Sequence, residues 1–365
     1  MVLRDSTSIF YYFISMLDSP EESQQSTSCS EDENSQSQPT MSPKFEFVET
    51  PKWCYDAKKW WNLAKVIHML GTRQQAIAFA EENCMVPKSK MCNYHKKPMS
   101  IVYTNNKTVG SFTCHKCAHA CKGRAKVSRA NGTWFENVKM SMPQIFYLMY
   151  AFANKWSYSM TIKENFADDK QCLSKATVCD WFKYCRETVI LYQLEKQTFL
   201  GKIGGPGKVV QIDETKFSKR KYNKGQHIEG QWVLGMIEDG SEDLRLEVCP
   251  NNIKTAEVLV PLIQKHVAEG TTIYINVGEA YDSLKDHNYV LKKLTDYFPA
   301  NPLCMHTQKI ESQWNVVKQF FSKDLYNREY LADFIIEYLW RRHIKINKCD
   351  PFEELIKAVK HVYKH

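Results

Sequence analysis

One stretch, from Val209 to Phe217, constrains the fold of this chain more than any other. Its sequence alternates apolar and polar residues and is rich in β-branched side chains, which predicts a strand. The run Gly204-Gly205-Pro206-Gly207 breaks any regular structure before it. The carboxylates of Asp213 and Glu214 interrupt this otherwise apolar strand. A buried carboxylate is costly without a partner, so the strand indicates either a divalent-metal site or an ordinary strand edge with a solvated charged turn.

Five basic residues follow these acids closely in the sequence. They are Lys216, Lys219, Arg220, Lys221 and Lys224. A cationic arm of this kind is suited to phosphate groups, and an acidic strand beside it suggests metal-assisted work on a nucleic-acid backbone. The formal net charge of +8 is compatible with a nucleic-acid partner without proving one. We therefore take the five basic residues as candidate DNA contacts.

Composition limits the compartment in which the chain works. Its 365 residues are enough for two or three domains with a substantial core. No apolar run reaches membrane-spanning length, and the short run 9–17 is followed by acidic residues where a signal peptide would have small ones. The 13 cysteines are an odd number spread along the chain, which fits a reducing compartment. We expect a nuclear protein with no membrane partner.

Changes in composition and periodicity divide the chain into six segments. These are a disordered leader (1–44), a helical segment resembling a helix-turn-helix unit (45–90), a zinc ribbon (91–135), a helical connector (136–203), an α/β core (204–343) and a C-terminal helix (344–365). The polar leader cannot bury enough apolar surface to fold. A tight turn at Gly71 favours a helix-turn-helix unit, and a helical hairpin that closes a core explains the pattern equally well. Within the connector, residues 161–186 could form a second helix-turn-helix unit, and a plain helical connector between ribbon and core is the alternative.

Two pairs of metal-ligating residues lie in the third segment. They are Cys92 with His95 and Cys114 with Cys117, each pair with two residues between its members. Thiolates and imidazole at this spacing on two turns are typical of a structural zinc site, which holds together a segment too small for a core of its own. His119 or Cys121 could replace one member, and free thiols are the alternative for the whole group.

The periodicity changes from helices to strands after Gly207. Strands are predicted at 209–217, 231–238, 244–249 and 271–276, with an amphipathic helix at 255–267 before the last of them. A long helix is predicted at about 308–326, with Glu311 in its first turn. Trp232 and Trp314 are expected in the core. Three strands, a helix and a further strand form the front half of a ribonuclease-H-like core, so the expected fold class is α/β.

Four blocks of this region resemble the transposase core of the Merlin superfamily of cut-and-paste DNA transposons. They are Val210-Gln211-Ile212-Asp213-Glu214-Thr215, Glu229-Gly230-Gln231-Trp232-Val233-Leu234-Gly235, Thr271-Thr272-Ile273-Tyr274 with Ala280-Tyr281, and His306-Thr307-Gln308-Lys309-Ile310-Glu311-Ser312 with Trp314. The resemblance covers about residues 90 to 343 and includes the cysteine ribbon. It implies a ribonuclease-H-like core whose Asp-Asp-Glu triad holds two Mg²⁺ ions for in-line displacement at a DNA phosphodiester.

The resemblance also implies the place of each acid. Asp213 would be the first and Glu311 the third, and the second would stand at the end of the fourth strand, where this sequence has Asn276. An amide offers a metal one oxygen but no negative charge to offset the repulsion between two dications. Glu279 or Asp282 could substitute, although Asp282 lies in a stretch that is ordinary for the family and Glu279 lies beyond the strand end.

Three hypotheses follow from these residues. We favour a transposase-derived DNA-binding protein whose degenerate site no longer cleaves or transfers strands. An active Mg²⁺-dependent transposase and a protein–protein interaction scaffold are the alternatives. Zinc is the expected structural cofactor, Mg²⁺ would bind through Asp213 and Glu311, and a homodimer is the assembly to test. Arg341 and Arg342 are expected either at a solvated helix end or at DNA.

Overall fold

The computed structural model describes residues 60–103, 109–120, 126–166, 173–217, 230–276, 279–293, 307–321 and 330–363. The predicted disordered leader, residues 1–44, lies outside this part of the chain. Among the described residues, no helix combines the length and the apolar character needed to cross a bilayer.

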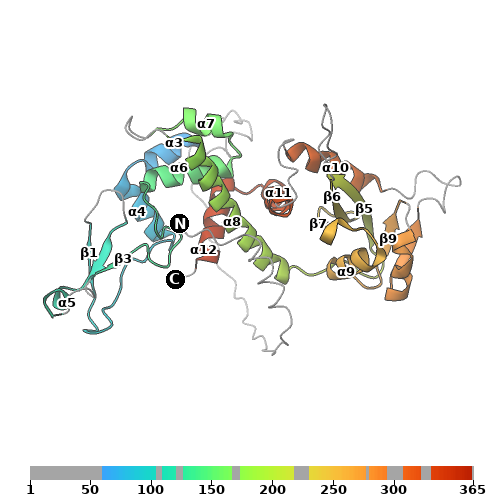
Figure 1. Cartoon of the computed structure of the whole chain (residues 1–365), viewed down its shortest axis with the longest axis horizontal. Coiled ribbons are helices and arrows are strands. Elements are labelled where there is room, and N and C mark those ends of the chain that lie inside the picture. Colours follow the sequence, from blue (N-terminus) through green and yellow to red (C-terminus); the bar gives the residue numbers. More distant parts are fainter. Residues whose placement is uncertain are drawn as a thin grey trace, which may run out of the picture. The chain divides into compact units, whose positions relative to one another are not determined.

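Helices from both ends of the described chain share one aromatic-rich core. They are α3 (Leu63–Leu70), α4 (Arg73–Glu82), α6 (Met142–Ala153), α7 (Tyr158–Lys163), α8 (Lys175–Phe199), α11 (Leu331–Ile346) and α12 (Pro351–Val362) (Figure 1). Nearly every residue of α6 is buried, which is expected of a helix that is apolar on all sides and lies inside a core. Both predicted helix-turn-helix pairs pack their apolar faces into this same core.

A three-stranded antiparallel sheet forms the ribbon. Its strands are β1 (Ser100–Val102), β2 (Ser111–Thr113) and β3 (Lys126–Ser128), and the short helix α5 (His115–Ala120) follows β2. Arg129, directly after β3, is fully buried and donates hydrogen bonds to the carbonyl oxygens of Pro87 and Val109. It also forms an ion pair with Glu81 of α4. These contacts fasten the base of the ribbon to α4 and to the segment that follows it.

A five-stranded sheet forms the α/β core, with the strand order β10-β9-β5-β6-β7. The strands are β5 (Val209–Phe217), β6 (Gln231–Glu238), β7 (Leu244–Val248), β9 (Thr272–Ile275) and β10 (Val290–Lys293). β5, β6 and β7 pair antiparallel, whereas β9 pairs parallel with β5 and β10 pairs parallel with β9. This order and these directions agree with the ribonuclease-H-like α/β core that the element sequence predicts.

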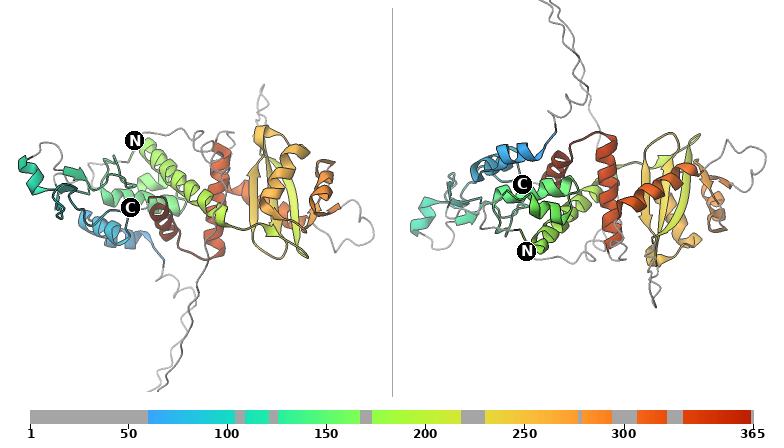
Figure 2. Two further views of the ribbon diagram at one scale, coloured as in Figure 1. Left: turned by 90° about the horizontal axis from the view of Figure 1, so that it is seen from below. Right: turned by 90° about the horizontal axis from the view of Figure 1, so that it is seen from above.

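Side chains of the sheet alternate between two faces, because successive residues of a strand point in opposite directions. On one face Ile212 belongs to a core with α9 (Ala256–His266) and the 3₁₀ segment η2 (Glu279–His287). On the other face Phe217 belongs to a core with α10 (Gln308–Phe320) and the first half of α11. Figure 2 shows the sheet with a helix over each of these faces.

Three features differ from the predicted elements. β10 has no counterpart among the predicted strands, because a run of only four residues ending in two lysines carries little strand signal. α10 ends at Phe320, short of the predicted end near residue 326, and residues 322–329 lie outside the described part. The predicted boundary between residues 343 and 344 falls inside α11, since no helix breaker occurs before Pro351.

Candidate functional site

Asp213 lies in β5 on the face that α10 covers. Its Oδ2 accepts a hydrogen bond of 3.0 Å from Trp314 Nε1 of α10. Burial is the main reason that the pKa of Asp213 rises to about 6; the Trp314 bond opposes this rise, and the charges of Glu214 and Glu311 add to it. Asp213 and Glu311, the predicted first and third acids, are therefore close enough to interact electrostatically.

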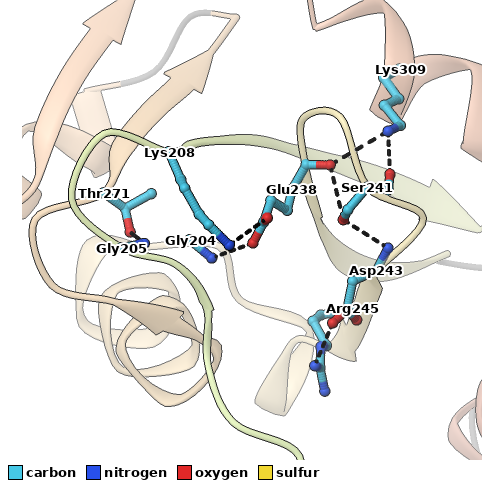
Figure 3. A network of polar contacts seen from close by, with 9 residues as sticks. All are labelled: Gly204, Gly205, Lys208, Glu238, Ser241, Asp243, Arg245, Thr271 and Lys309. Atoms are coloured by element: carbon cyan, nitrogen blue, oxygen red, sulfur yellow. Dashed lines mark hydrogen bonds and ion pairs between the residues drawn. The ribbon is translucent and has the colours of Figure 1, made fainter.

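Two side chains fix the start of α10 on the sheet. Gln211 of β5 accepts hydrogen bonds through Oε1 from the backbone N–H of Lys309 and from that of the next residue, at 3.1 and 3.3 Å. Lys309 Nζ in turn donates to the carbonyl oxygens of Glu238 and Ser241, in the turn between β6 and β7 (Figure 3). Because Glu311 stands two residues after Lys309, these bonds set the position from which its side chain extends.

The same turn is also tied to the start of β5. Glu238, the last residue of β6, accepts hydrogen bonds from the backbone N–H of Gly204 at 2.8 Å and from Lys208 Nζ at 2.9 Å (Figure 3). These bonds lower the pKa of Glu238, so the carboxylate stays ionised and the contacts persist at neutral pH. One turn thus holds the segment before β5 and, through Lys309, the beginning of α10.

β6 leaves room for Trp314 directly opposite Asp213. The residue paired with Asp213 in β6 is Gly235. A Cβ atom at Gly235 would lie 2.6 Å from Trp314 Cζ2 and 2.9 Å from Ile310 Cδ1, which is closer than such atoms approach. The missing side chain therefore allows the Trp314 ring to lie against the sheet and to reach Asp213.

Asn276 stands beside Asp213, directly after β9. β5 and β9 pair in parallel with Gln211 opposite Tyr274, and continuing this register by two residues brings Asn276 opposite Asp213. Both line one pocket. Its lining residues are Ile212, Asp213, Glu214, Trp232, Lys254, Asn276 and Tyr281. Among the described residues, no trio of carboxylate, imidazole or thiol groups around Asp213 is close enough to share a cation.

The other acids near the pocket already have partners. Glu214 accepts a hydrogen bond of 2.6 Å from Tyr281 Oη and lies 3.2 Å from Lys254 Nζ, on the face opposite to α10. Successive residues of a strand point to opposite faces, so Glu214 points away from Asp213. Asp282 forms an ion pair of 2.6 Å with a lysine of β10. The side chain of Glu279 lies outside the described residues, so its predicted role as a replacement for the second acid stays a prediction.

The predicted DNA contacts are only partly described. Lys216 is exposed at the end of β5. The remaining four, Lys219, Arg220, Lys221 and Lys224, lie outside the described residues. Their role in DNA binding therefore stays a prediction.

Arg341 and Arg342 are engaged inside the protein. Arg341 Nε lies 2.7 Å from a carboxylate oxygen of Glu337, and its terminal nitrogens donate to the carbonyl oxygens of Phe152 and Ala153 at the end of α6. Arg342 forms an ion pair of 2.5 Å with Glu242 and is itself mostly buried. The solvated helix end expected for these arginines is wrong, because both side chains are mostly buried and bind acceptors within the protein. A DNA contact by either arginine stays a prediction.

The four predicted zinc ligands come together. Cys92, His95, Cys114 and Cys117 place one ligand atom each so that all lie within 4.8 Å of one another. The Cys92 and Cys117 sulfurs are 3.6 Å apart, and His95 Nδ1 lies 3.3–3.7 Å from the three sulfurs. A tetrahedral zinc ion with ordinary bond lengths needs about 3.8 Å between sulfurs and about 3.6 Å between sulfur and nitrogen. The donor set and its dimensions therefore fit zinc.

The surroundings of the thiols agree with this assignment. The backbone N–H of His95 is the main reason that the pKa of Cys92 falls to about 6. Burial is the main reason that the pKa of Cys117 rises to about 12, with the neighbouring thiols adding to it. A divalent cation would allow both thiols to ionise together. Cys92 and His95 share a turn, as predicted. The second pair differs from the prediction, because Cys117 lies in the short helix α5.

Comparison with known proteins gives one family match within the chain. Residues 199–343 match a model described as the ISXO2-like transposase domain. The solved catalytic core domain of BIV integrase aligns at 17% identity and a TM-score of 0.25, covering 43% of this chain and 98% of that one. A comparison with curated proteins found no match. The family match spans the five-stranded sheet, α9, α10 and most of α11, and it supports a transposase-type domain of the Asp-Asp-Glu class in this region.

Several residues of this site are not found by the sequence prediction. Trp314 is assigned to the core, where it does lie, but its bond to Asp213 is not anticipated. The spacing of three residues between Glu311 and Trp314 is the signal, since it puts both on one side of a helix. Trp232 packs against the core as expected, but it is only half-buried, and its position at the pocket beside Lys254 is not anticipated. No local pattern identifies that pair, because the contact joins a strand to a loop.

Proposed function

We propose that this chain is a DNA-binding protein derived from a transposase of the Merlin superfamily, whose catalytic site has lost strand cleavage and transfer. The proposal rests on the position of Asn276 beside Asp213 at one pocket. An amide stands at the end of the neighbouring strand, where the two-metal mechanism calls for a second carboxylate.

The physical consequence of this amide is a loss of charge. Two dications about 4 Å apart repel each other, and carboxylates that bridge them offset that repulsion. With Asp213 and Glu311 as its only acids, the triad has one formal negative charge fewer than a complete Asp-Asp-Glu triad. Asp213 also gives up one carboxylate oxygen to Trp314. We therefore expect Mg²⁺ to bind too weakly for the in-line displacement that requires two metals.

Several candidate DNA contacts lie outside this pocket. The zinc ribbon presents an exposed Tyr94 next to exposed Lys96 and Lys97 at its first ligand turn. The chain carries a net charge of +8, and the basic arm joins the paired ends of β5 and β6. Phosphate contacts of this kind give affinity that falls with salt and need no catalytic metal. A nuclear location and a homodimer belong to the same proposal.

The test uses the purified, zinc-loaded full chain with duplex, nicked and hairpin DNA in Mg²⁺ or Mn²⁺. We expect binding whose affinity falls steeply with salt concentration, and no cleavage. Cleavage that disappears in Asp213→Ala would instead establish an active transposase. If no DNA binding occurs at any salt concentration, a protein–protein scaffold becomes the better hypothesis. Restoration of cleavage by Asn276→Asp would identify the amide as the cause of the lost activity.

A further inference from the structure

A lysine stands over the pocket that contains Asn276. Lys254 Nζ lies 4.3 Å from the centroid of the Trp232 ring and 3.2 Å from Glu214 Oε1. Its side chain is 45% exposed, so the ammonium group is accessible from solvent while it lines the pocket. A cation over an indole face is held there by the ring's negative charge distribution.

The backbone that carries this lysine is fixed to the sheet. Asn252, two residues earlier, accepts a hydrogen bond of 2.8 Å from the Trp232 backbone N–H and donates one of 2.8 Å to the Gly230 carbonyl. Asn251 and Asn252 adopt left-handed backbone conformations, at φ values of 53° and 61°, which Asn tolerates better than most residues. The turn before Lys254 is thus built to bring it above Trp232, rather than left free in solvent.

A second lysine faces the same ring. Lys216 is the residue paired with Trp232 across β5 and β6, and its Nζ lies 5.6 Å from the ring centroid. Lys216, Trp232 and Lys254 together form what we call the lysine–tryptophan patch. It leads from the outer end of β5 to the pocket, so a nucleic-acid strand that followed it would bring one phosphate to Asn276.

Asn276 changes what the pocket can hold. A carboxylate at this position could only accept hydrogen bonds, whereas the amide can donate through Nδ2. The nearby acids are already engaged, Glu214 by Tyr281 Oη at 2.6 Å and Asp213 by Trp314 Nε1 at 3.0 Å. A pocket with Lys254 and an amide donor, and one negative charge fewer, is better suited to an anion than the same pocket with a third acid.

We propose that this pocket binds one DNA phosphodiester directly, without a divalent cation, through Lys254 Nζ and the amide of Asn276. The inference deepens the proposed function and rests on it, since it names where the DNA backbone meets the degenerate site. Lys254 exchanges its contact with Glu214 for one with the phosphate, and Trp232 keeps the ammonium group in place during the exchange.

The experiment measures binding of the zinc-loaded full chain to a fluorescent DNA duplex, over a series of salt concentrations, in buffer freed of divalent cations and again with Mg²⁺. Lys254→Gln should reduce the slope of log affinity against log salt by about 0.9, the value for one lost phosphate contact. Asn276→Asp should weaken binding in metal-free buffer, and the addition of Mg²⁺ should reverse part of that loss.

Lys265→Gln is the matched control. Lys265 is a similarly exposed lysine that pairs with a glutamate of the same domain, Glu247, but does not line the pocket. Equal slopes for Lys254→Gln and Lys265→Gln, or undiminished metal-free binding by Asn276→Asp, would overturn the inference while leaving the proposed function intact. If the wild-type chain binds no DNA, the inference and the proposed function fail together. Thermal unfolding of each variant checks that its fold is preserved.

Discussion

At the scale of single residues, the environment of Asp213 explains much of the site. The carboxyl group is partly buried, accepts a bond from Trp314, and lies near Glu214 and Glu311. Burial raises its pKa to about 6. Ionised Asp213 is therefore less favourable in the folded protein than in the unfolded chain, where its pKa is near 4. A bound cation or a neutral side chain would relieve this cost.

Replacing Asp213 with Asn should consequently stabilise the metal-free protein at neutral pH. The folded pKa is raised, so the stability contributed by protonated Asp213 is fully present below about pH 4 and is lost as pH rises through 6. The gain from Asp213→Asn should be about 1 kcal/mol at pH 7.5, because a partly exposed carboxyl is screened by water, and close to zero at pH 4. Urea unfolding at the two pH values measures it.

Asp282→Asn is the control, because the pKa of Asp282 is shifted in the opposite direction to that of Asp213. The hydrogen bond from Lys293 is the main reason that the pKa of Asp282 is lowered, so its ionised form favours folding. This variant should show no gain at pH 7.5. An equal gain from both substitutions would mean that general charge reduction, and not the local environment of Asp213, is responsible.

At the scale of elements, the contact between β6 and α10 determines the geometry of the acids. Gly235 lies under Trp314, and Gln211 and Lys309 hold the first turn of α10. A helix packed this closely on a strand transmits any change in spacing to the residues it carries. The position of Glu311 relative to Asp213 thus depends on the close approach of α10 at Gly235, a residue that cannot itself be a metal ligand through its side chain.

Gly235→Ala should therefore displace α10. The new Cβ would meet Trp314 Cζ2 at 2.6 Å, and overpacking of this kind costs about 1–3 kcal/mol. Urea unfolding measures the loss, and tryptophan fluorescence should report the disturbed Trp314 ring. Gly201→Ala is the matched control, since a Cβ at Gly201 would meet no atom within 4 Å. Equal stability of the two variants would contradict the close packing described here.

The ribbon is the other element whose form depends on a few side chains. Its strands are three residues each, and its own buried cluster consists of the three cysteines. A segment this small has little apolar surface to bury, so we expect metal binding at the four candidate ligands to stabilise its fold.

Cys114→Ser should therefore release zinc and unfold the ribbon, while the helical core remains. Zinc content measured by mass spectrometry and protease cleavage within residues 91–135 are the readouts. Cys179→Ser serves as the control, because Cys179 is exposed and lies outside the cluster. Zinc retained at full stoichiometry in Cys114→Ser would exclude this residue as a ligand.

At the scale of the whole molecule, α11 belongs to two cores. Ile335 and Tyr338 pack with α10 and the sheet, whereas Trp340 and Ile344 pack with the other helices. The same helix carries Glu337, which is buried and accepts hydrogen bonds from Arg186 at 2.6 Å and from Arg341 at 2.7 Å. Burial would raise its pKa, but the two arginines lower it, so the group is ionised and fully paired.

Glu337→Ala should destabilise the chain by about 3–5 kcal/mol, because it leaves two guanidinium groups without their shared carboxylate. Since Arg341 also binds the end of α6, the loss should appear in unfolding of both the helices and the sheet, followed by circular dichroism and tryptophan fluorescence. Glu242→Ala removes an exposed partner of Arg342 and should cost at most about 1 kcal/mol. Similar losses from both variants would argue against a special role for Glu337.

Local sequence patterns were sufficient for most of the elements and for the candidate zinc ligands. Alternation gave β5 and β6 with their observed ends, and the paired spacing of cysteine and histidine identified four residues that do converge. These features depend on neighbours within a few positions. Arg341 could not be assigned in this way. It was expected at a helix end, and no local pattern indicates the carbonyl groups that it binds nearly 190 residues away in the sequence.

The order of residues was enough to identify the side chains that could serve as acids and metal ligands, and to place Asn276 at the end of a predicted strand. The folded chain was needed to show that Asn276 lies beside Asp213, that Trp314 donates to that acid across a separation of 101 residues, and that Lys254 lies over the Trp232 ring. The physical reason is that strand register and helix packing arise from contacts between distant segments, and no local periodicity encodes those contacts.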